Sequence, residues 1–547
     1  MFARVKKSGH YQYLQIVENS RIGGKVRQRV ITTVGRLDQL QAKGNVETLI
    51  RSLARFSEKT LLVLSGKADV EAQAVKIGPA LIFERLWREL GLPAILDDLL
   101  AGRKFVFAVE RAIFLTVLHR LCVSGSDRSC DQWRRDYAIA GVEDIALHQV
   151  YRAMAFLGEV LPDQAGATPF SPRCTKDLFE EAMFRRHRNL FTGLELVFFD
   201  TTSIYFEGEG GETLGQFGHS KDHRSDRKQM VVGAILDDTG RPICCEMWPG
   251  NTADVKSLLP VAEKLRSRFG VERFCIVADR GMISADTIEA LEQPDCRIPY
   301  ILGARMRRVK EVSDEVLARA GRYREVHPEL MKEATSPAPL AVKEVMVEGR
   351  RYIVCRNSRQ ARKDTAARQA MVEALEERLK SNPKGLVGNR GYARYLKVSK
   401  GAMTIDRDKL EKEARFDGKW VLRTNMNLPA EKVALKYKEL WQVEQVFRDM
   451  KSVLDTRPIF HKRDQTIRGH VFCSFLALVL RKELDRRLES AGHQLEWEEI
   501  KRDLKALQRV TVEEEGRRLA VRTTCAGSCG KIFQAVGVAL PPTISEA

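Results

Sequence analysis

The feature that most constrains the fold is a series of short apolar segments between residues 194 and 302. Each segment has the length of a buried β-strand rather than that of a helix. The first three follow one another without an intervening helix, and the later ones alternate with expected helices. The expected strands are 194–199, 230–236, 242–247, 273–278 and 298–302, and the expected helices are 255–269 and 284–291. The sequence therefore predicts an α/β fold in which helices cover a mixed sheet.

Two aspartates follow two of these expected strands. Asp200 comes directly after the apolar run LVFF and Asp279 comes after CIVA, so both are expected where a buried strand reaches solvent. Carboxylates at the ends of adjacent strands can converge, and a hard divalent ion such as Mg²⁺ prefers such oxygen ligands. An aspartate after a strand is equally often a turn former or a helix cap. Neither residue is informative alone.

A third carboxylate lies in the segment YKELWQVEQVFRDMK, from Tyr437 to Lys451, which is expected to form one helix. Tyr437, Glu444 and Lys451 recur every seven residues, and at about 100° per residue they fall within about 40° of one another. Apolar residues form a separate stripe, so one face can pack while the other carries a hydroxyl, a carboxylate and an amine, with Arg448 beside them. Considered alone, this pattern is also typical of a solvated polar face.

The chain of 547 residues carries a formal net charge of +18. This excess predicts a polyanionic partner, and nucleic acid is favoured over a membrane because no apolar run reaches the length of a spanning helix. Residues 1–60 contain 12 Lys and Arg against 4 Asp and Glu. Two β-like runs in that segment, 11–19 and 25–35, predict a basic hairpin. The N-terminus lacks the apolar core of a secretory signal, which predicts a cytoplasmic protein.

The helical patterns within residues 61–176 predict a helical region. A helix expected at 143–157 is either a DNA-reading helix, presenting His148, Gln149 and Arg152, or an ordinary bundle helix.

Residues 305–425 interrupt the α/β pattern with a basic run, a hairpin pattern and a charged helix at 360–380, which predicts an insertion. A long amphipathic helix is expected at 470–488, followed by a polar tail. The eleven cysteines are scattered, and reduced thiols are the expectation. Cys525 and Cys529 form one close pair that would suit zinc.

The acids and the segments around them resemble the DDE transposases of bacterial insertion sequences. More narrowly, Tyr437, Glu444 and Lys451 match the signature of the subgroup that forms hairpins at its DNA ends, which reads Tyr, two residues, Arg, three residues, Glu, six residues, Lys. The Arg position is Leu440 here, and Arg448 is a candidate to replace it. The other matching segments are DTTS at 200–203, GHSKDHRSDRKQ at 218–229, GNTAD at 250–254, ADRGM at 278–282 and FDGKWVLRTN at 416–425.

The resemblance implies a ribonuclease H-like, mixed-sheet catalytic core that is divided along the chain by an insertion domain. The expected organisation is a basic β-hairpin module at 1–60, a helical DNA-binding region at 61–176, the first part of the core at 177–304, a charged and partly β insertion domain at 305–425, the second part of the core at 426–490 and a C-terminal tail at 491–547.

The resemblance also implies a mechanism. Asp200, Asp279 and Glu444 would hold Mg²⁺, or Mn²⁺ in its place, at the scissile phosphate, where water and then a DNA 3′-hydroxyl attack in line. Tyr437 and Lys451 would contact the DNA near the cut. The implied process is cut-and-paste transposition by a homodimer on double-stranded DNA, namely the terminal inverted repeats and the target, in the bacterial cytoplasm and at the nucleoid. Further implied DNA contacts are Arg448, Arg280, Lys221, His223, Arg224 and Lys228.

Two other functions stay open at this point. One is a metal-dependent nuclease that cuts without joining, and the other is a catalytically idle DNA-binding regulator with the same fold. Passage of the excised ends through a hairpin is also open. The hydroxyls of Thr201, Thr202 and Ser203 are not expected to be nucleophiles, because no motif places a base beside them.

Overall fold

The structure is a computed structural model of the whole chain. It describes residues 2–546 except 23–24, 55–70, 166, 169–170, 188–195, 295–296, 327–339, 382–394, 400–401 and 515–516. The chain divides into two compact units. The first consists of residues 1–74, 510–522 and 542–547, and the second of residues 75–509 and 523–541.

The first unit begins with a three-stranded antiparallel sheet, followed by two short helices. The predicted hairpin is confirmed, although its glycine turn at 23–24 lies outside the described residues. A strand that was not predicted, β1, pairs with β2 from Phe2 opposite Val17 to Ser8 opposite Tyr11. The elements are β1 (Phe2–Ser8), β2 (Tyr11–Ile22), β3 (Lys25–Arg36), α1 (Leu37–Ala42) and α2 (Asn45–Ala54).

The C-terminal segment is not the expected tail. It forms two helices and three strands, and the strands belong to a four-stranded sheet in the order β18-β17-β16-β4. The helices were not predicted because polar surface residues interrupt their apolar pattern. Each helix buries only one side, as shown by Trp497 and Ile500 in α18. The elements are β4 (Glu71–Lys76), α18 (Trp497–Ala506), β16 (Gln508–Glu514), β17 (Arg517–Arg522), α19 (Cys529–Val536) and β18 (Ile544–Glu546).

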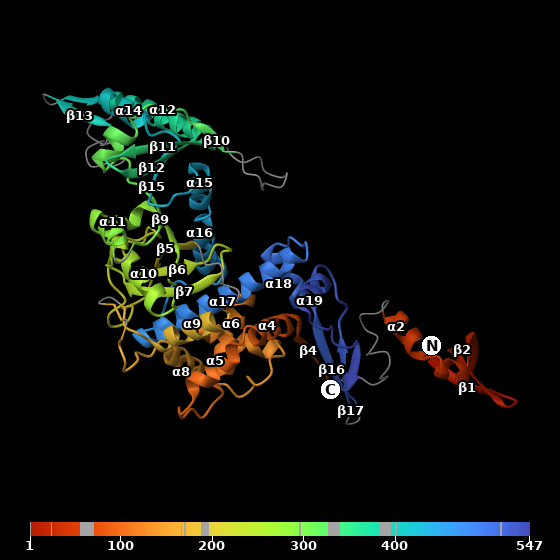
Figure 1. The fold of residues 1–547 in the computed structure, drawn as a ribbon. Coiled ribbons are helices and arrows are strands. Elements are labelled where there is room, and N and C mark those ends of the chain that lie inside the picture. Colours follow the sequence, from red (N-terminus) through yellow and green to blue (C-terminus); the bar gives the residue numbers. More distant parts are fainter. Residues whose placement is uncertain are drawn as a thin grey trace. The chain divides into compact units, whose positions relative to one another are not determined.

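The second unit is built on a nine-stranded mixed sheet in the order β10-β11-β12-β15-β9-β8-β5-β6-β7 (Figure 1). β5, β6 and β7 are antiparallel to one another, whereas β8 is parallel to β5 and β9 is parallel to β8. The five predicted strands are confirmed, as are the two helices between them. They are β5 (Leu196–Tyr205), β6 (Gln229–Leu236), β7 (Pro242–Pro249), α10 (Leu258–Ser267), β8 (Cys275–Ala278), α11 (Ala285–Glu292) and β9 (Tyr300–Gly303).

Helices cover both faces of the central strands, which explains why their sequences are apolar without interruption. On β5, Val197 and Phe199 belong to the core shared with α10, whereas Phe198 belongs to the larger core shared with the helices of the opposite face. Because side chains alternate along a strand, Asp200 is on the same face as Phe198.

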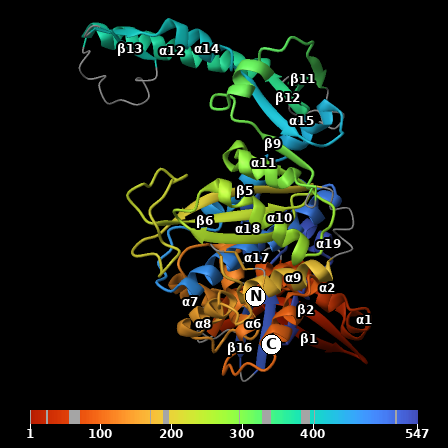
Figure 2. The same ribbon diagram turned by 60° about the vertical axis from the view of Figure 1, so that its left-hand side comes forward.

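Residues 305–425 interrupt the chain but not the sheet. β15 pairs antiparallel with β9, so four strands from this segment extend the core sheet, while α12, α14 and a small hairpin lie beyond it (Figure 2). The pairing of distant strands could not be seen in the local pattern. The elements are η5 (Glu311–Val316), β10 (Arg324–Val326), β11 (Leu340–Val347), β12 (Arg350–Asn357), α12 (Ser358–Ser381), β13 (Leu396–Ser399), β14 (Ala402–Ile405), α14 (Arg407–Ala414) and β15 (Lys419–Thr424).

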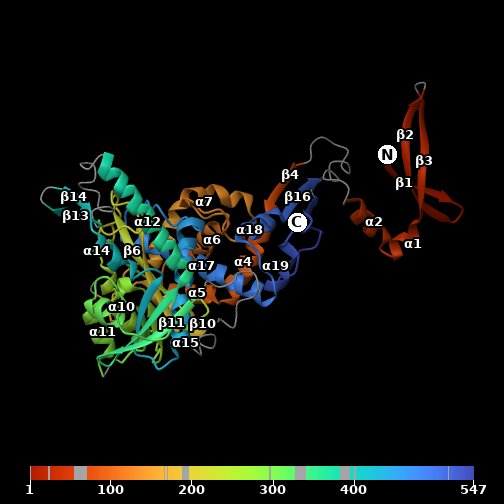
Figure 3. The same ribbon diagram turned by 90° about the horizontal axis from the view of Figure 1, so that it is seen from above.

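A long helix, α17 (Asp464–Ser490), runs through the helical part of this unit and contacts α4, α6 and α19 (Figure 3). It was expected to be amphipathic, but it is buried on most sides along residues 464–480. The other helices are α4 (Gly78–Glu89), α5 (Leu92–Leu100), α6 (Val109–Cys122), α7 (Asp127–Trp133), α8 (Leu147–Leu157) and α9 (Thr175–Arg186). None of the helices described is both long enough and apolar enough to cross a bilayer.

The helix expected at 143–157 is α8, and it packs as a bundle helix. Its apolar face is buried against α6 and α17. The side-chain oxygen of Gln149 accepts a hydrogen bond from the backbone N–H of Ala146 at 2.8 Å, so this residue caps its own helix. His148 and Arg152 are exposed.

Candidate active site

The register of β5 and β8 brings the two aspartates together. These parallel strands pair Phe199 with Ala278, so the next positions, Asp200 and Asp279, are neighbours although 79 residues separate them in the sequence. Asp200 does not end its strand as expected, because β5 continues to Tyr205 along β6. It lies where the parallel pairing with β8 stops. Asp279 comes directly after β8.

Asp200 lies in an acidic and largely enclosed place, with 19% of its side chain exposed. Burial raises the pKa of the Asp200 carboxyl to about 6. The ammonium group of Lys221 and the backbone N–H of Thr201 oppose this rise in pKa, whereas the nearby carboxylates of Asp279 and Asp254 add to it. The site therefore concentrates negative charge that a cation would relieve.

Asp254 is a fourth carboxylate at this place, and the sequence analysis did not select it. It opens the short helix η3 (Asp254–Lys256) within the GNTAD segment. Its Oδ1 accepts a hydrogen bond from Thr201 Oγ1 at 2.8 Å, and its Oδ2 is 3.4 Å from Lys221 Nζ. The sequence feature that could have identified Asp254 is its position in GNTAD, a segment that resembles the transposase family.

Lys221 was expected to contact DNA, but its ammonium group points to these acids. The nitrogen is 3.8 Å from Asp200 Oδ1 and donates to the carbonyl oxygen of Thr201 at 2.6 Å. The hydroxyls near it hold the loop and the sheet together, since Ser203 Oγ accepts from the backbone N–H of Lys221 at 2.8 Å. Thr201 Oγ1 also accepts a hydrogen bond from Lys221 Nζ at 2.9 Å, so a carboxylate and an amine flank this hydroxyl, although no sequence motif indicated a base there.

The segment from 437 to 451 is not one regular helix. α15 (Ala430–Lys438) ends at Lys438, α16 (Trp441–Arg448) begins three residues later, and a π-helical turn, η7 (Asp449–Val453), follows. Between α15 and α16 the hydrogen bonds tighten to three-residue spacing, as from Leu440 N–H to Tyr437 O at 3.1 Å. The seven-residue spacing therefore does not fix the relative directions of Tyr437, Glu444 and Lys451.

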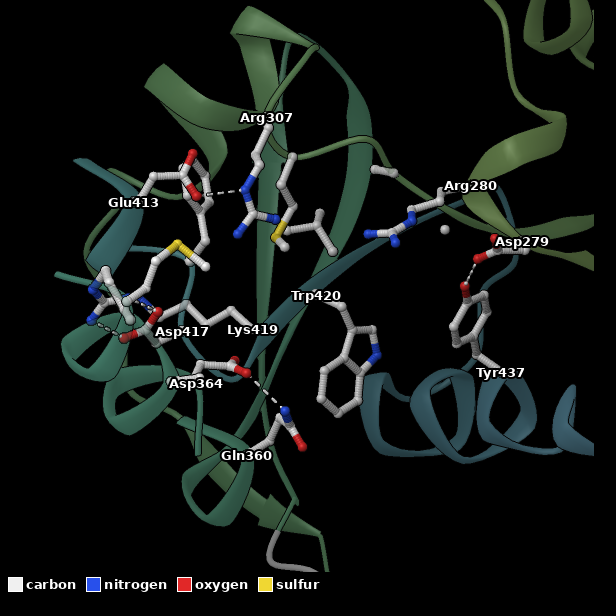
Figure 4. A pocket seen from close by; sticks show the side chains of 18 of the residues that line it. Asp279, Arg280, Arg307, Gln360, Asp364, Glu413, Asp417, Lys419, Trp420 and Tyr437 are labelled. Atoms are coloured by element: carbon white, nitrogen blue, oxygen red, sulfur yellow. Dashed lines mark hydrogen bonds and ion pairs between the residues drawn. The ribbon is translucent and has the colours of Figure 1, made fainter. Parts of the chain in front are cut away.

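Glu444 nevertheless lies at the same cavity as Asp279 and Tyr437. The buried face of α16, made of Val443, Val446 and Phe447, packs toward the sheet, which leaves Glu444 exposed on the other side. A cavity of about 680 Å³ is lined by these three residues and by residues of the segment 305–425. Figure 4 shows the part of its lining around Asp279 and Tyr437.

Tyr437 is tied directly to the second aspartate. Its hydroxyl donates to Asp279 Oδ1 at 3.0 Å, and burial, with the charge of Asp279, raises the pKa of the Tyr437 hydroxyl (Figure 4). The close approach depends on Gly303, because a Cβ at that position would lie 2.4 Å from the hydroxyl oxygen. No local sequence pattern marks Gly303, because the requirement arises only from the tertiary approach of α15.

Two other residues shape this cavity. Arg280 projects its guanidinium into it, and the indole of Trp420 extends from β15 into the same cavity (Figure 4). Trp420 was quoted in the FDGKWVLRTN segment but was not selected. An aromatic side chain at a cavity with basic residues is typical of contact with unpaired bases.

Lys451 contacts the loop formed by residues 219–228. Its Nζ is 2.8 Å from Asp222 Oδ1, and Arg457 pairs with the same oxygen at 2.5 Å. Burial lowers the pKa of the Lys451 ammonium, although the hydrogen bond to Asp222 opposes that change. Lys451 thus contacts Asp222, and the preceding residue, Lys221, has its ammonium group 3.8 Å from Asp200 Oδ1.

The remaining predicted DNA contacts lie in the loop between β5 and β6 and at the end of α16. Arg224 pairs with Asp226 at 2.9 Å, and Lys228 pairs with Glu209 at 2.6 Å. His223 is exposed. Arg448 is also exposed and donates to Gln445 at 3.1 Å.

Leu440, at the Arg position of the signature, is buried in the core with 6% exposure. This position thus packs here instead of offering a charge.

A second polar cluster lies away from these acids. Nε2 of His461 is 3.0 Å from Asp127 Oδ2 and 3.2 Å from His470 Nδ1. A metal could bind such a group of three, but Arg120 Nη2 already lies 3.0 Å from His470 Nδ1 and 3.4 Å from Asp127 Oδ1. The buried Arg120 guanidinium therefore already supplies a positive charge to Asp127 within this cluster. Among the described residues, Cys525 and Cys529 belong to no comparable group of three ligands.

Residues 192–480, more than half of the chain, match the model of the transposase DDE domain. The chain belongs to the DDE transposase family. Residues 3–68 match the N-terminal domain of IS1634 family transposases. DNA transposition and DNA binding follow from this membership, and DDE transposases generally use divalent metal ions. The matched region contains all three predicted acids.

A comparison with curated proteins found no match. Among solved structures, the transposase is similar to the piggyBac transposase synaptic complex with hairpin DNA, at 11% identity and a TM-score of 0.36. That similarity covers 78% of this chain and 79% of the other.

Proposed function

We propose that this transposase moves its element by cut-and-paste transposition. It binds the terminal inverted repeats, cuts the DNA at the element ends and joins the 3′-hydroxyl ends to target DNA. The observation that carries the proposal is the parallel register that makes Asp200 and Asp279 neighbours, with Glu444 and Tyr437 at the same cavity as Asp279.

We assign the first part of the sheet to a ribonuclease H-like core. In chain order, the first acid is on the first strand, β5, and the second follows the fourth strand, β8. The third is on a later helix, α16. This is the order that the family resemblance implies. On this assignment, residues 177–304 and 426–490 make the core, and residues 305–425 extend its sheet and form one wall of the cavity.

The residues present fit a hard divalent cation. Asp254 and Asp279 lie close enough for their charges to raise the pKa of Asp200, and the Lys221 ammonium is drawn to Asp200 and Asp254. Asp200, Asp279 and Glu444 would hold Mg²⁺, or Mn²⁺ in its place. Bound there, the metal would supply Lewis-acid stabilisation of the charge that develops on the scissile phosphate.

The protein's own groups account for the rest of the proposed chemistry. Tyr437 fixes the orientation of Asp279 through its hydrogen bond. Lys451, which pairs with Asp222 in this structure, would bind a DNA phosphate in place of that carboxylate. Arg280 contributes positive charge at the cavity, and Trp420 offers a stacking surface for an unpaired base. No covalent enzyme intermediate is required, because the attacking groups are water and a DNA 3′-hydroxyl. Since two ends must be joined together, we propose a homodimer on DNA.

The test is incubation of the full chain with Mg²⁺ and labelled DNA that carries the ends of its element. Wild type is expected to cut and join, and Glu444→Gln is expected to lose both reactions while it keeps DNA binding. Glu439→Gln is the matched control, because Glu439 is a nearby half-buried glutamate outside the cavity lining. Full cleavage by Glu444→Gln would refute the assignment of the third acid.

The same assay separates the alternatives. Cleavage without joining by the wild type would favour a nuclease, and specific binding of the ends without cleavage would favour a regulator. A labelled product with covalently closed ends would show that the ends pass through a hairpin, as the subgroup signature implies.

A further inference from the structure

A second basic surface lies between α8 and the start of α17. This groove, of about 680 Å³, is lined by Arg103, Arg152, Lys462 and Arg463 together with aromatic residues, and its one carboxylate is Glu159. Glu159 pairs with Arg103 at 3.0 Å, so the groove keeps a positive charge. We call it the basic groove.

Three cations of the basic groove are not neutralised by acids. Among the described residues, Arg152, Lys462 and Arg463 are exposed and form no ion pair. The guanidinium of Arg152 lies 5.7 Å from the ring centroid of Phe105 and 5.5 Å from that of Phe107. It is held in place by aromatic faces, which leave its charge available to an anion. Many other arginines of this chain, such as Arg224, pair with a carboxylate.

The floor of the basic groove is fixed by the buried cluster described above. His461 lines the groove and directly precedes Lys462 and Arg463. Its imidazole contacts Asp127 at 3.0 Å, and its ring packs edge-on against Tyr151 at 5.5 Å between centroids. The anchored His461 holds the backbone of Lys462 and Arg463 at the groove, which removes part of the entropic cost of binding a phosphate backbone.

The basic groove is connected to the acids through β5. After Asp200 this strand ends at Tyr205, and the next residue, Phe206, forms a parallel bridge with Ile459, two residues before His461. From Asp200 to Phe206 an extended chain at about 3.3 Å per residue spans at most about 20 Å, and the two residues from Ile459 to His461 add at most about 7 Å. Along the way, Arg457 lies over the ring of Tyr205 at 5.9 Å. Duplex DNA rises about 3.4 Å per base pair, so this path equals about six to eight base pairs.

We propose that the basic groove binds the phosphate backbone of the duplex whose end lies at the acids, about six to eight base pairs from the scissile phosphate. The position rests on the proposed function, because it assumes a DNA end at Asp200 and Asp279. The groove is expected to bind DNA without regard to base sequence, because its cations contact phosphates and not base edges. The basic groove would thus extend the contact between the protein and the duplex beyond the cleavage site.

The test measures the salt dependence of binding by the full chain, in EDTA, to a duplex of about 30 base pairs that ends at the cleavage site. The triple variant Arg152→Gln/Lys462→Gln/Arg463→Gln is expected to lower the slope of log K against log salt by about 2.7, from three phosphate contacts at about 0.9 each. The charge-conserving variant Arg152→Lys/Lys462→Arg/Arg463→Lys is the matched control and is expected to keep the wild-type slope. Lys432→Gln, an exposed lysine on α15, controls for general loss of charge.

Hydroxyl-radical footprints give the position. The triple variant is expected to lose protection about six to eight base pairs from the cut and to keep it elsewhere. An unchanged salt slope, a change seen with single-stranded DNA alone, or lost protection at another position would each overturn the proposal. Cleavage by the wild type in Mg²⁺ tests the proposed function separately, so a failure of either inference is recognisable.

Discussion

Replacing Asp200 by Asn is expected to stabilise the metal-free transposase while it abolishes activity. Asp200 is held, mainly by burial, in a place that raises the pKa of its carboxyl from 3.8 to about 6. That difference corresponds to about 3 kcal/mol by which the folded state disfavours the ionised carboxylate relative to the unfolded chain. Asn has a similar shape and no charge, so Asp200→Asn removes this cost.

The sign of the effect sets its pH dependence. The folded protein binds the proton of Asp200 more tightly than the unfolded chain does, so protonation stabilises the fold. That stabilisation is fully present below about pH 3.8 and is lost as the pH rises through about 6. Relative to wild type, Asp200→Asn should therefore gain about 3 kcal/mol near pH 7.5 and less than about 1 kcal/mol near pH 4.

Hydrogen exchange of the β5 and β8 amides is the appropriate assay, because it reports the stability of this sheet in a protein with several cooperative parts. Exchange rates are corrected for the intrinsic effect of pH and compared at about pH 4, 6 and 7.5. Asp226→Asn is the control, since Asp226 is a surface carboxylate whose pKa is lowered by its hydrogen bond with Arg224. No gain for Asp200→Asn at pH 7.5, or an equal gain at pH 4, would refute the electrostatic account of this site.

Two further predictions concern the helix segment and its partners. Leu440→Arg should destabilise the fold by about 3 kcal/mol or more, because a guanidinium would enter a core position that is 6% exposed. A thermal unfolding midpoint equal to that of wild type would show instead that the site accepts the family Arg. Asp222→Asn should lower stability by about 1 to 3 kcal/mol without DNA, because Lys451 and Arg457 lose their shared carboxylate. The loss should shrink with bound duplex DNA if a phosphate replaces that carboxylate, and an equal loss in both states would contradict a phosphate role for Lys451.

The central strands and the candidate acids were predictable because burial on two faces leaves a direct mark on the sequence. LVFF before Asp200 and CIVA before Asp279 are continuous apolar runs, and such runs occur where helices cover both sides of a sheet. The chain order of strands and helices then limits the sheet to a few arrangements.

The features that were missed depend on contacts between distant residues. The continuation of β5 past Asp200 results from its pairing with β6, and β15 joins the sheet only because it meets β9. The break between α15 and α16 was hidden because a seven-residue spacing presumes a regular helix, whereas hydrogen bonds near Leu440 are tighter. Asp254 was missed for a related reason, since its contacts with Thr201 and Lys221 come from another part of the chain.

The position of each candidate acid depends on a different kind of interaction, which determines what can disturb it. Asp200 and Asp279 are aligned by backbone register, and a shift of one residue between β5 and β8 would turn the carboxylate of Asp200 to the opposite face. Glu444 depends on side-chain packing of α16, whose apolar residues can be exchanged for others of similar volume. Lys221 is placed by a loop, and its ammonium group is held by the acids and by the carbonyl oxygen and hydroxyl of Thr201. The two aspartates therefore form the rigid part of the site, and Lys221 is the part most able to move when a cation or a DNA phosphate arrives.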